Sequence, residues 1–209
     1  MTIDGRLARG ERTRTAVLDS ALVLATSEGL DGLSLSQLAL ALGISKAGLF
    51  AHWRSKESLQ LAVIEHARAQ WVDEVIKPAL RAPRGVRRLW AVHDRRLAFY
   101  EGERLPGRCF FANANFEFNA RPGAIRDRLE VQCRDWMTFL TGLCTEAVEA
   151  GDLRPVLDPA ALAYEVEALG VCAVMQAPVL GPATFRHARR ALLDHLRALV
   201  TDPTLLEQP

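Results

Sequence analysis

Apolar residues recur at intervals of three and four along most of the chain, and no stretch alternates between apolar and polar residues with a period of two. Val17, Ala21 and Leu24 form one such series, and Leu59 and Val63 begin another. The first spacing places side chains on one face of an α-helix, whereas a half-buried strand requires the second. We therefore predict an all-α fold with about nine helices. They are expected near residues 17–28, 35–42, 46–53, 55–77, 86–100, 109–119, 123–150, 158–177 and 182–201.

Two of the expected helices are short and are joined by a turn that contains glycine. Ser34 and Gln37 have the spacing of a capping box at the start of the first, and Ser45 can cap the second. Gly43 lies where the turn requires a positive φ. Residues 35–53 therefore form a helix-turn-helix, the unit that lays its second helix in the major groove of DNA.

The distribution of charge supports a DNA-binding head. The whole chain carries 26 Lys and Arg residues against 25 Asp and Glu residues, which excludes a polybasic tail but not a local basic face. Between Gly32 and Lys56 there are three cations and no acidic residue. Four arginines precede this window, and we expect them to form an N-terminal arm that follows the minor groove or the phosphates. They are Arg6, Arg9, Arg12 and Arg14.

The segment LSLSQLALALGISKAGLFAHWRSKESL, residues 33–59, resembles the DNA-binding segment of the tetracycline-repressor (TetR) family of bacterial regulators. A weaker likeness to one branch of that family lies in GRCFFANANFEFNARPGAIRDRL, residues 107–129. The resemblance implies a helix-turn-helix head, residues 1–55, and a larger helical domain for effector binding and dimerisation, residues 56–209. It also implies a homodimer that binds a near-palindromic double-stranded operator and responds to a small molecule.

Carried over to this sequence, the resemblance makes Ser45 to Trp53 the recognition helix. The expected DNA-binding residues are Ser36, Gln37, Ser45, Lys46, Ala47, Gly48, Phe50, His52, Arg54 and Lys56. Lys46 could donate to guanine O6 or N7, or could bind a phosphate without reading sequence. Gly48 and Phe50 replace residues that usually carry hydroxyls, and Trp53 is expected in the core.

The central part of the chain concentrates aromatic residues among a few polar ones, as a small-molecule site requires. The alternative is that most of these aromatic residues are ordinary core. The expected ligand-binding residues are His93, Asn113, Phe116, Trp136, Phe139 and Met175. The helix at 55–77 is expected to link this site to the head, because it begins against one and ends beside the other.

Two apolar stripes near the end of the chain predict the dimer interface. Pairing two helices with their two-fold mates would give a four-helix contact. The expected interface residues are Leu162, Val166, Leu169, Ala173, Leu192, Leu196 and Leu199.

The four cysteines stand far apart, and the polar first residues do not resemble a signal peptide, so we expect a reduced cytoplasmic protein. Arg108 could make the Cys109 thiol a redox or electrophile sensor, although a buried inert thiol is the alternative. The charge-free stretch 168–185 contains glycine and proline, and we expect a buried helix there rather than a membrane span. The five histidines show no metal-binding spacing, and we expect neither a metal nor a cofactor.

No catalytic motif is present: the chain lacks G-x-S-x-G, a P-loop, G-x-G-x-x-G and H-E-x-x-H. We therefore expect no enzyme and assign no catalytic residue. The alternatives are a helical small-molecule-binding protein or enzyme without DNA binding, and a helical interaction module. The effector, the operator, the regulated genes and the direction of regulation are not encoded in any motif of this sequence.

Overall fold

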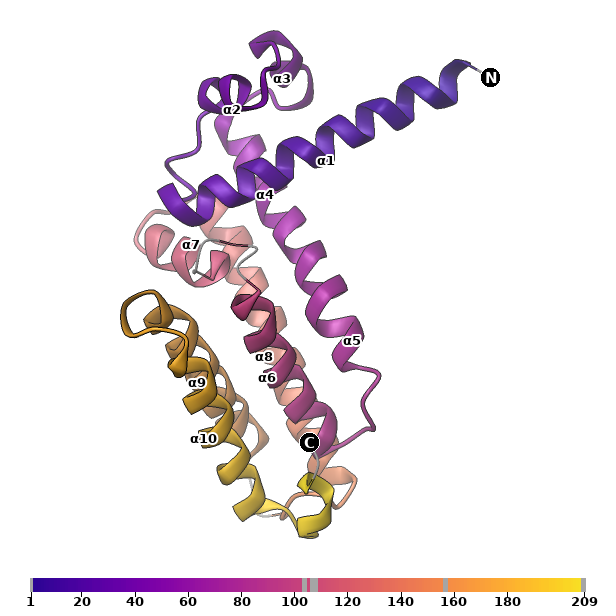
Figure 1. Ribbon diagram of the computed structural model, residues 1–209, viewed down its shortest axis with the longest axis vertical. Coiled ribbons are helices and arrows are strands. Elements are labelled where there is room, and N and C mark those ends of the chain that lie inside the picture. The colour runs from indigo at the N-terminus through magenta and orange to yellow at the C-terminus, as the bar shows by residue number, and fades with distance from the viewer. Residues whose placement is uncertain (1, 103–104, 106–108, 156–157, 208–209) are drawn as a thin grey trace.

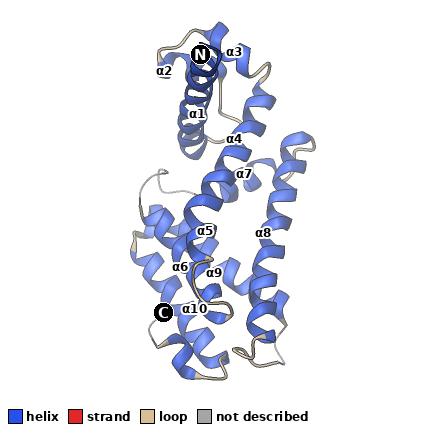
Figure 2. Ribbon diagram, turned by 90° about the vertical axis from the view of Figure 1, so that its right-hand side faces the viewer, coloured by secondary structure: helices blue, strands red, loops and turns tan. Residues whose placement is uncertain are grey.

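A computed structural model describes residues 2–102, 105, 109–155 and 158–207, and most of these residues lie in helices joined by short loops (Figures 1 and 2). No strand occurs among these residues, which confirms the all-α fold. The helices are α1 (Thr2–Glu28), α2 (Leu35–Leu42), α3 (Lys46–His52), α4 (Lys56–Trp71), a π-helical turn (Val72–Ile76), α5 (Lys77–Ala79), α6 (Val86–Glu101), α7 (Phe110–Phe118), α8 (Ala124–Glu149), α9 (Pro159–Leu180) and α10 (Ala183–Leu199), followed by a 3₁₀ turn (Pro203–Leu206). Since α4, the π turn and α5 are continuous, the described residues form nine helical rods, as predicted.

The head consists of α1, α2, α3 and the first turns of α4, at one end of the molecule (Figure 1). Ser34 caps α2 by accepting from the Gln37 backbone N–H, and Ser45 caps α3 by accepting from the Gly48 N–H at 3.1 Å. Gly43 has the predicted positive φ, +62°. A capping box with reciprocal hydrogen bonds is present at Ser55, not at Ser34, where the bond returning from the Gln37 side chain is absent.

The first helix is longer than predicted, because α1 begins at Thr2. The expected N-terminal arm is therefore part of a helix rather than an extended segment. The side chains of Arg6 and Arg9 lie outside the described residues. Arg14 places its guanidinium over the buried Trp53 ring, 5.8 Å from the ring centroid, and so packs against the head.

In the larger part of the molecule α6 and α8 pack beside the long helix formed by α4 and α5, α9 packs on α6 and α8, and α10 packs on α6 and α9. The helix α8 runs along much of the length of this part (Figure 2). The apolar core of the head continues into this part, because Phe110 and Ala114 of α7 and Ile125 of α8 belong to it. The boundary expected at residue 55 falls on the N-cap of α4. This domain boundary stays a prediction, and the apolar core contains residues from both sides of it.

Candidate DNA-binding surface and effector cavity

The expected DNA-binding residues lie on the outside of the head. Ser36, Gln37, Ser45, Lys46, Ala47, Gly48, Phe50, His52, Arg54 and Lys56 are all exposed. Leu38, Leu49 and Trp53 point the other way and are no more than 3% exposed, so they fix the two short helices on the apolar core. This arrangement leaves one side of α3 free for a DNA groove. Contact of these residues with DNA stays a prediction.

One of these cations is already paired within the chain. The Lys56 ammonium lies 3.0 Å from a carboxylate oxygen of Asp31, and Arg121 lies 2.7 Å from the other oxygen. Hydrogen bonds from Lys56 and then from Arg121 lower the pKa of Asp31 below its usual value. Sequence reasoning missed Asp31, because it precedes the acid-free window by one residue and its partner Arg121 is 90 residues away.

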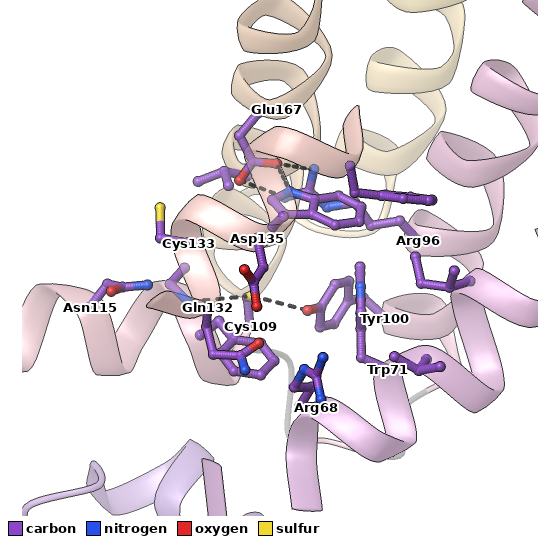
Figure 3. Close-up of a pocket in the computed structure, with 17 residues that line it drawn as sticks. Arg68, Trp71, Arg96, Tyr100, Cys109, Asn115, Gln132, Cys133, Asp135 and Glu167 are labelled. Atoms are coloured by element: carbon purple, nitrogen blue, oxygen red, sulfur yellow. Dashed lines mark hydrogen bonds and ion pairs between the residues drawn. The ribbon is translucent and has the colours of Figure 1, made fainter. Parts of the chain in front are cut away.

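A cavity of about 290 Å³ lies where α4, α6, α7, α8 and α9 meet (Figure 3). Its walls combine aromatic and aliphatic side chains with a few polar groups. The lining residues are Arg68, Trp71, Val72, Ile76, Arg96, Tyr100, Cys109, Phe111, Ala112, Asn115, Gln132, Cys133, Asp135, Trp136, Phe139, Glu167 and Val171. The π turn between α4 and α5 supplies Val72 and Ile76, and such turns are frequent at functional sites.

An ion pair between the buried Arg96 and the half-buried Glu167 forms one wall of the cavity. Arg96 Nη1 and Nη2 lie 2.7 Å and 3.2 Å from the two carboxylate oxygens of Glu167, and the Trp136 indole N–H donates to the same carboxylate at 2.6 Å. Burial would lower the pKa of Arg96, but Glu167 raises it above its usual value. Gly170 makes this arrangement possible, since a Cβ there would lie 2.4 Å from Arg96 Nη1.

The Cys109 thiol faces the same cavity. Its sulfur accepts a hydrogen bond from the Tyr100 hydroxyl at 3.0 Å and one from the Ala112 backbone N–H at 3.4 Å, which makes Cys109 the N-cap of α7. Burial, followed by the interaction with Cys109, raises the pKa of Tyr100 well above its usual value, so the hydroxyl remains a donor. Arg108, on which the sequence argument for this cysteine depended, lies outside the described residues.

Only two of the six expected ligand-binding residues line the cavity. Trp136 and Phe139 do so, and ligand contact by them stays a prediction. The prediction of Phe116 is wrong, because this residue is 67% exposed and does not line the cavity. Asn115 lines the cavity, whereas the predicted Asn113 does not. On a nine-residue helix the difference of two positions turns a side chain by about half a turn.

His93 and Met175 were also expected in the cavity, and neither lines it. Met175 is half-buried on α9 and does not line the cavity. Val171, one helical turn earlier, lines the cavity in its place. His93 lies in the packing between α6 and α10, 1% exposed, and neither ring nitrogen has a hydrogen-bond partner. Burial is the main reason that its pKa falls to about 3, so the ring is neutral.

A second contact joins the head to the larger domain through α7. The Glu117 carboxylate accepts from the backbone N–H groups of Leu30 and Asp31, both at 2.8 Å. Gly29 permits this approach, because it has a φ of +88° and a Cβ there would lie 2.9 Å from the carboxylate. The other end of α7 lines the cavity. The sequence argument assumed that the helix formed by α4 and α5 is the only link between the cavity and the head. The structure shows α7 as a second link.

Most of the expected dimer residues are buried within one chain. Leu162, Val166, Ala173, Leu192 and Leu196 are at most 4% exposed, so they pack α9 and α10 inside the protomer and cannot meet a partner. Leu169 and Leu199 are half-buried. The spacing of apolar residues identified the stripe of α9 that faces into the protomer and not the one that faces outward. Both stripes are apolar, so the spacing alone could not distinguish them.

The outward face of α9 is also apolar. It carries Ala161, Tyr164, Ala168, Cys172 and Val179, all of which are exposed. In the described part of the chain, α9 is the one helix that is long and apolar enough to cross a membrane by length and composition. Only 33% of the most apolar 18-residue segment of α9 is buried. The stretch that we expected to form a buried helix is therefore only partly buried.

Comparison with known proteins places this arrangement in a family. The family of bacterial regulatory proteins named tetR matches residues 17–63, and a tetracyclin repressor-like C-terminal domain matches residues 85–192. The second match alone spans more than half of the 209 residues. The chain therefore belongs to the TetR family of transcriptional regulators, as the helix-turn-helix segment predicted. No curated protein sequence matches it.

Solved structures share the fold over nearly the whole chain. A TetR transcriptional regulator from Chloroflexus aurantiacus J-10-FL is 28% identical, with a TM-score of 0.83, and the match covers 92% of this chain and 98% of that one. AibR in complex with isovaleryl coenzyme A and operator DNA is 21% identical, with a TM-score of 0.66 and coverages of 88% and 96%. The ketosteroid regulator KstR2 of Mycobacterium tuberculosis is 16% identical, with a TM-score of 0.67 and coverages of 91% and 96%.

Proposed function

We propose that the protein is a ligand-responsive transcriptional repressor that binds a near-palindromic operator as a homodimer. A small, mostly apolar molecule enters the cavity and changes the affinity for DNA. The observation that carries the proposal is the exposed side of α3, held on the buried Leu49 and Trp53 within a window that has no acidic residue. The protein acts in the cytoplasm and needs no cofactor, metal or catalytic residue for this role.

The partner in the homodimer covers the exposed apolar face of α9. Tyr164 and Val179 are 69% and 84% exposed in one chain, and contiguous apolar surface of this kind marks protein contacts. Ala161, Ala168 and Cys172 are small enough to let two helices approach closely. Ala168→Glu places a charge at the centre of this face without touching the protomer core. We expect a monomer by light scattering, and a dimer of unchanged mass would contradict the interface.

The effector site is the cavity. Its aromatic walls favour a planar, mostly apolar molecule, while Arg96, Tyr100 and Asn115 can orient it by hydrogen bonds. AibR, which shares this fold, was solved with both isovaleryl coenzyme A and operator DNA, and this supports a protein that binds a small molecule and DNA together; the ligand of AibR is not assigned to this chain.

The change in the cavity reaches the head through two helices. The long helix of α4 and α5 contributes Trp71 and Val72 to the cavity, and α7 holds the Leu30 and Asp31 backbone with Glu117. The recognition helices of such dimers bind half-sites whose centres lie about 34–36 Å apart, so a small rotation of each head prevents simultaneous binding.

Selection of bound DNA from a random pool tests the proposal. The wild-type protein should enrich two inverted half-sites, and Lys46→Ala should change the preferred base at one position if Lys46 reads guanine, at a cost of about 1–3 kcal/mol per half-site. A variant that keeps the preferred sequence and only binds more weakly assigns Lys46 to a phosphate. Enrichment of no sequence at low salt would refute DNA binding and favour a small-molecule-binding protein without it.

A further inference from the structure

We propose that Cys109 is a covalent site within the cavity for planar α,β-unsaturated ketones and aldehydes, and that the adduct weakens operator binding. The first half of the proposal concerns the cavity alone. The second half rests on the proposed function, because it requires an operator.

The sulfur is placed to act as a nucleophile toward a molecule in the cavity. Cys109 is 6% exposed, yet it is one of the cavity-lining residues. Its sulfur accepts from the Tyr100 hydroxyl at 3.0 Å and from the Ala112 N–H at 3.4 Å (Figure 3). Both donors stabilise negative charge on the sulfur during attack, and a helix N-terminus adds to this effect.

A second group in the cavity lacks a partner that a ligand could supply. Arg96 is 4% exposed, and although its Nη atoms bind Glu167, its Nε–H has no hydrogen-bond acceptor. A buried donor without an acceptor costs free energy, so a ligand oxygen that accepts from it is favoured. The rings of Trp71, Phe111 and Trp136 line the same space. Together these groups fit a flat conjugated molecule that carries one carbonyl oxygen.

The reaction is a conjugate addition. The Cys109 sulfur attacks the β-carbon, a carbon–sulfur bond forms, and the carbon–carbon π bond breaks. Its electron pair moves to the carbonyl oxygen, which can accept from the Arg96 Nε–H. The thiol proton leaves to water and a proton returns to the α-carbon, so the product is a neutral thioether. No oxidant or reductant is consumed.

The other thiols lack this environment. Burial raises the pKa of Cys144 to about 12, and this residue does not line the cavity. Burial also raises the pKa of Cys133, which lines the cavity but is exposed. Cys172 lies on the outward face of α9. Cys109 is thus the thiol that a cavity-bound carbonyl compound should select, whereas a small polar reagent should first reach the exposed Cys133, because the partner covers Cys172 in the proposed homodimer.

The adduct is formed at the end of a helix that also holds the head. The sulfur caps α7, and the substituent must take space beside Phe111 and Asn115 of the same helix. Eight residues further on, Glu117 binds the Leu30 and Asp31 backbone. A displacement of α7 at the cavity therefore acts on the loop that precedes α2.

The test compares 4-phenylbut-3-en-2-one with its saturated analogue, 4-phenylbutan-2-one, which cannot undergo the addition. We expect one equivalent of the unsaturated ketone on the peptide that contains Cys109, before Cys133 or Cys172 is modified, as read by intact mass and peptide mapping. Iodoacetamide should instead modify the exposed Cys133 before Cys109. Operator affinity should fall about tenfold after modification, within the usual range of coupling between two sites.

Two variants separate the chemistry from general damage. Cys109→Ser retains an oxygen that can cap α7 and should show neither an adduct at this position nor a loss of operator affinity on treatment. Tyr100→Phe removes one donor to the sulfur and should slow the addition at Cys109 about fivefold, while leaving modification of the exposed Cys133 by iodoacetamide unchanged.

Each outcome decides one half of the proposal. Modification of Cys133 or Cys172 before Cys109 by the unsaturated ketone would overturn the covalent site, and untreated protein that binds its operator would leave the proposed function standing. An adduct at Cys109 with unchanged operator affinity would overturn the link to the head. Failure of the untreated protein to bind any operator would refute the proposed function, while peptide mapping would still decide the covalent site.

Discussion

The head and the cavity hold their functional groups in opposite ways. In the head, Lys46, Arg54 and the other expected contact residues project from two short helices into solvent, while Leu38 and Leu49 fix the backbone beneath them. In the cavity, the Arg96 charge is directed inward and is balanced by Glu167 from another helix. A surface site thus depends on one short segment, whereas a cavity depends on the relative placement of five helices.

The largest difference between the two regions is expected when a charge is removed. Glu167→Gln leaves the charge of Arg96, whose side chain is 5% exposed, buried without its anion, and loss of one partner of a buried pair costs about 3–5 kcal/mol of unfolding free energy. Arg54→Ala on the head surface should stay within about 0.5 kcal/mol of the wild type. Urea unfolding measures both. Adding Arg96→Met to Glu167→Gln should recover stability, because it removes the stranded charge, and equal losses from Glu167→Gln and Arg54→Ala would break the comparison.

Acid should destabilise the larger domain through His93. The pKa of this residue falls from 6.5 to about 3 on folding, so the unfolded chain binds the proton more tightly between these values. Stability is therefore lost as the pH falls from 6.5 toward 3, by about 2 kcal/mol at pH 5. His93→Leu should lose less stability than the wild type between pH 7 and pH 5 in urea unfolding. An equally steep loss in the variant would contradict the assignment.

The smallest effect is expected at Lys56, on the border between the two regions. If its ammonium exchanges Asp31 for a phosphate in the complex, Lys56→Ala should lower the slope of log affinity against log salt by about 0.9 for each phosphate that the protein no longer neutralises. The decrease in affinity should be similar for all DNA sequences. An unchanged slope would show that Lys56 remains with Asp31 and serves the head rather than DNA.

The sequence predicted the head better than the cavity for a physical reason. Ser34, Gly43 and Ser45 cap or turn helices through neighbours within four residues, so their roles can be inferred locally. Phe116 and Met175 were misplaced because a helical period does not fix which face meets which neighbour. The contact of Glu117 with Leu30, 87 residues away, has no local signal at all.

The dimer residues illustrate the same limit. The stripe of Leu162 and Val166 was recognised as apolar, but burial within the protomer accounts for it. The outward face, with Tyr164 and Ala168, is apolar as well. A helix that is apolar all round does not reveal from its sequence which side packs inside the chain.

The central proposal is that occupancy of the cavity changes DNA binding through α7 together with the long helix of α4 and α5. Val171→Phe fills the cavity from α9 without a ligand, and Val131→Phe on the exposed surface of α8 is the matched control. Glu117→Gln weakens the hold of α7 on the head, because an amide N–H₂ group replaces one of the two accepting oxygens.

The decisive measurement is operator affinity across the double-mutant cycle of Val171→Phe and Glu117→Gln. We predict that Val171→Phe changes the affinity about tenfold in the wild-type background and by a smaller factor in the Glu117→Gln background, where only the route through α4 and α5 remains intact, while Val131→Phe changes it in neither. A folded Val171→Phe dimer with unaltered operator affinity, or an equal change in both backgrounds, would contradict the account.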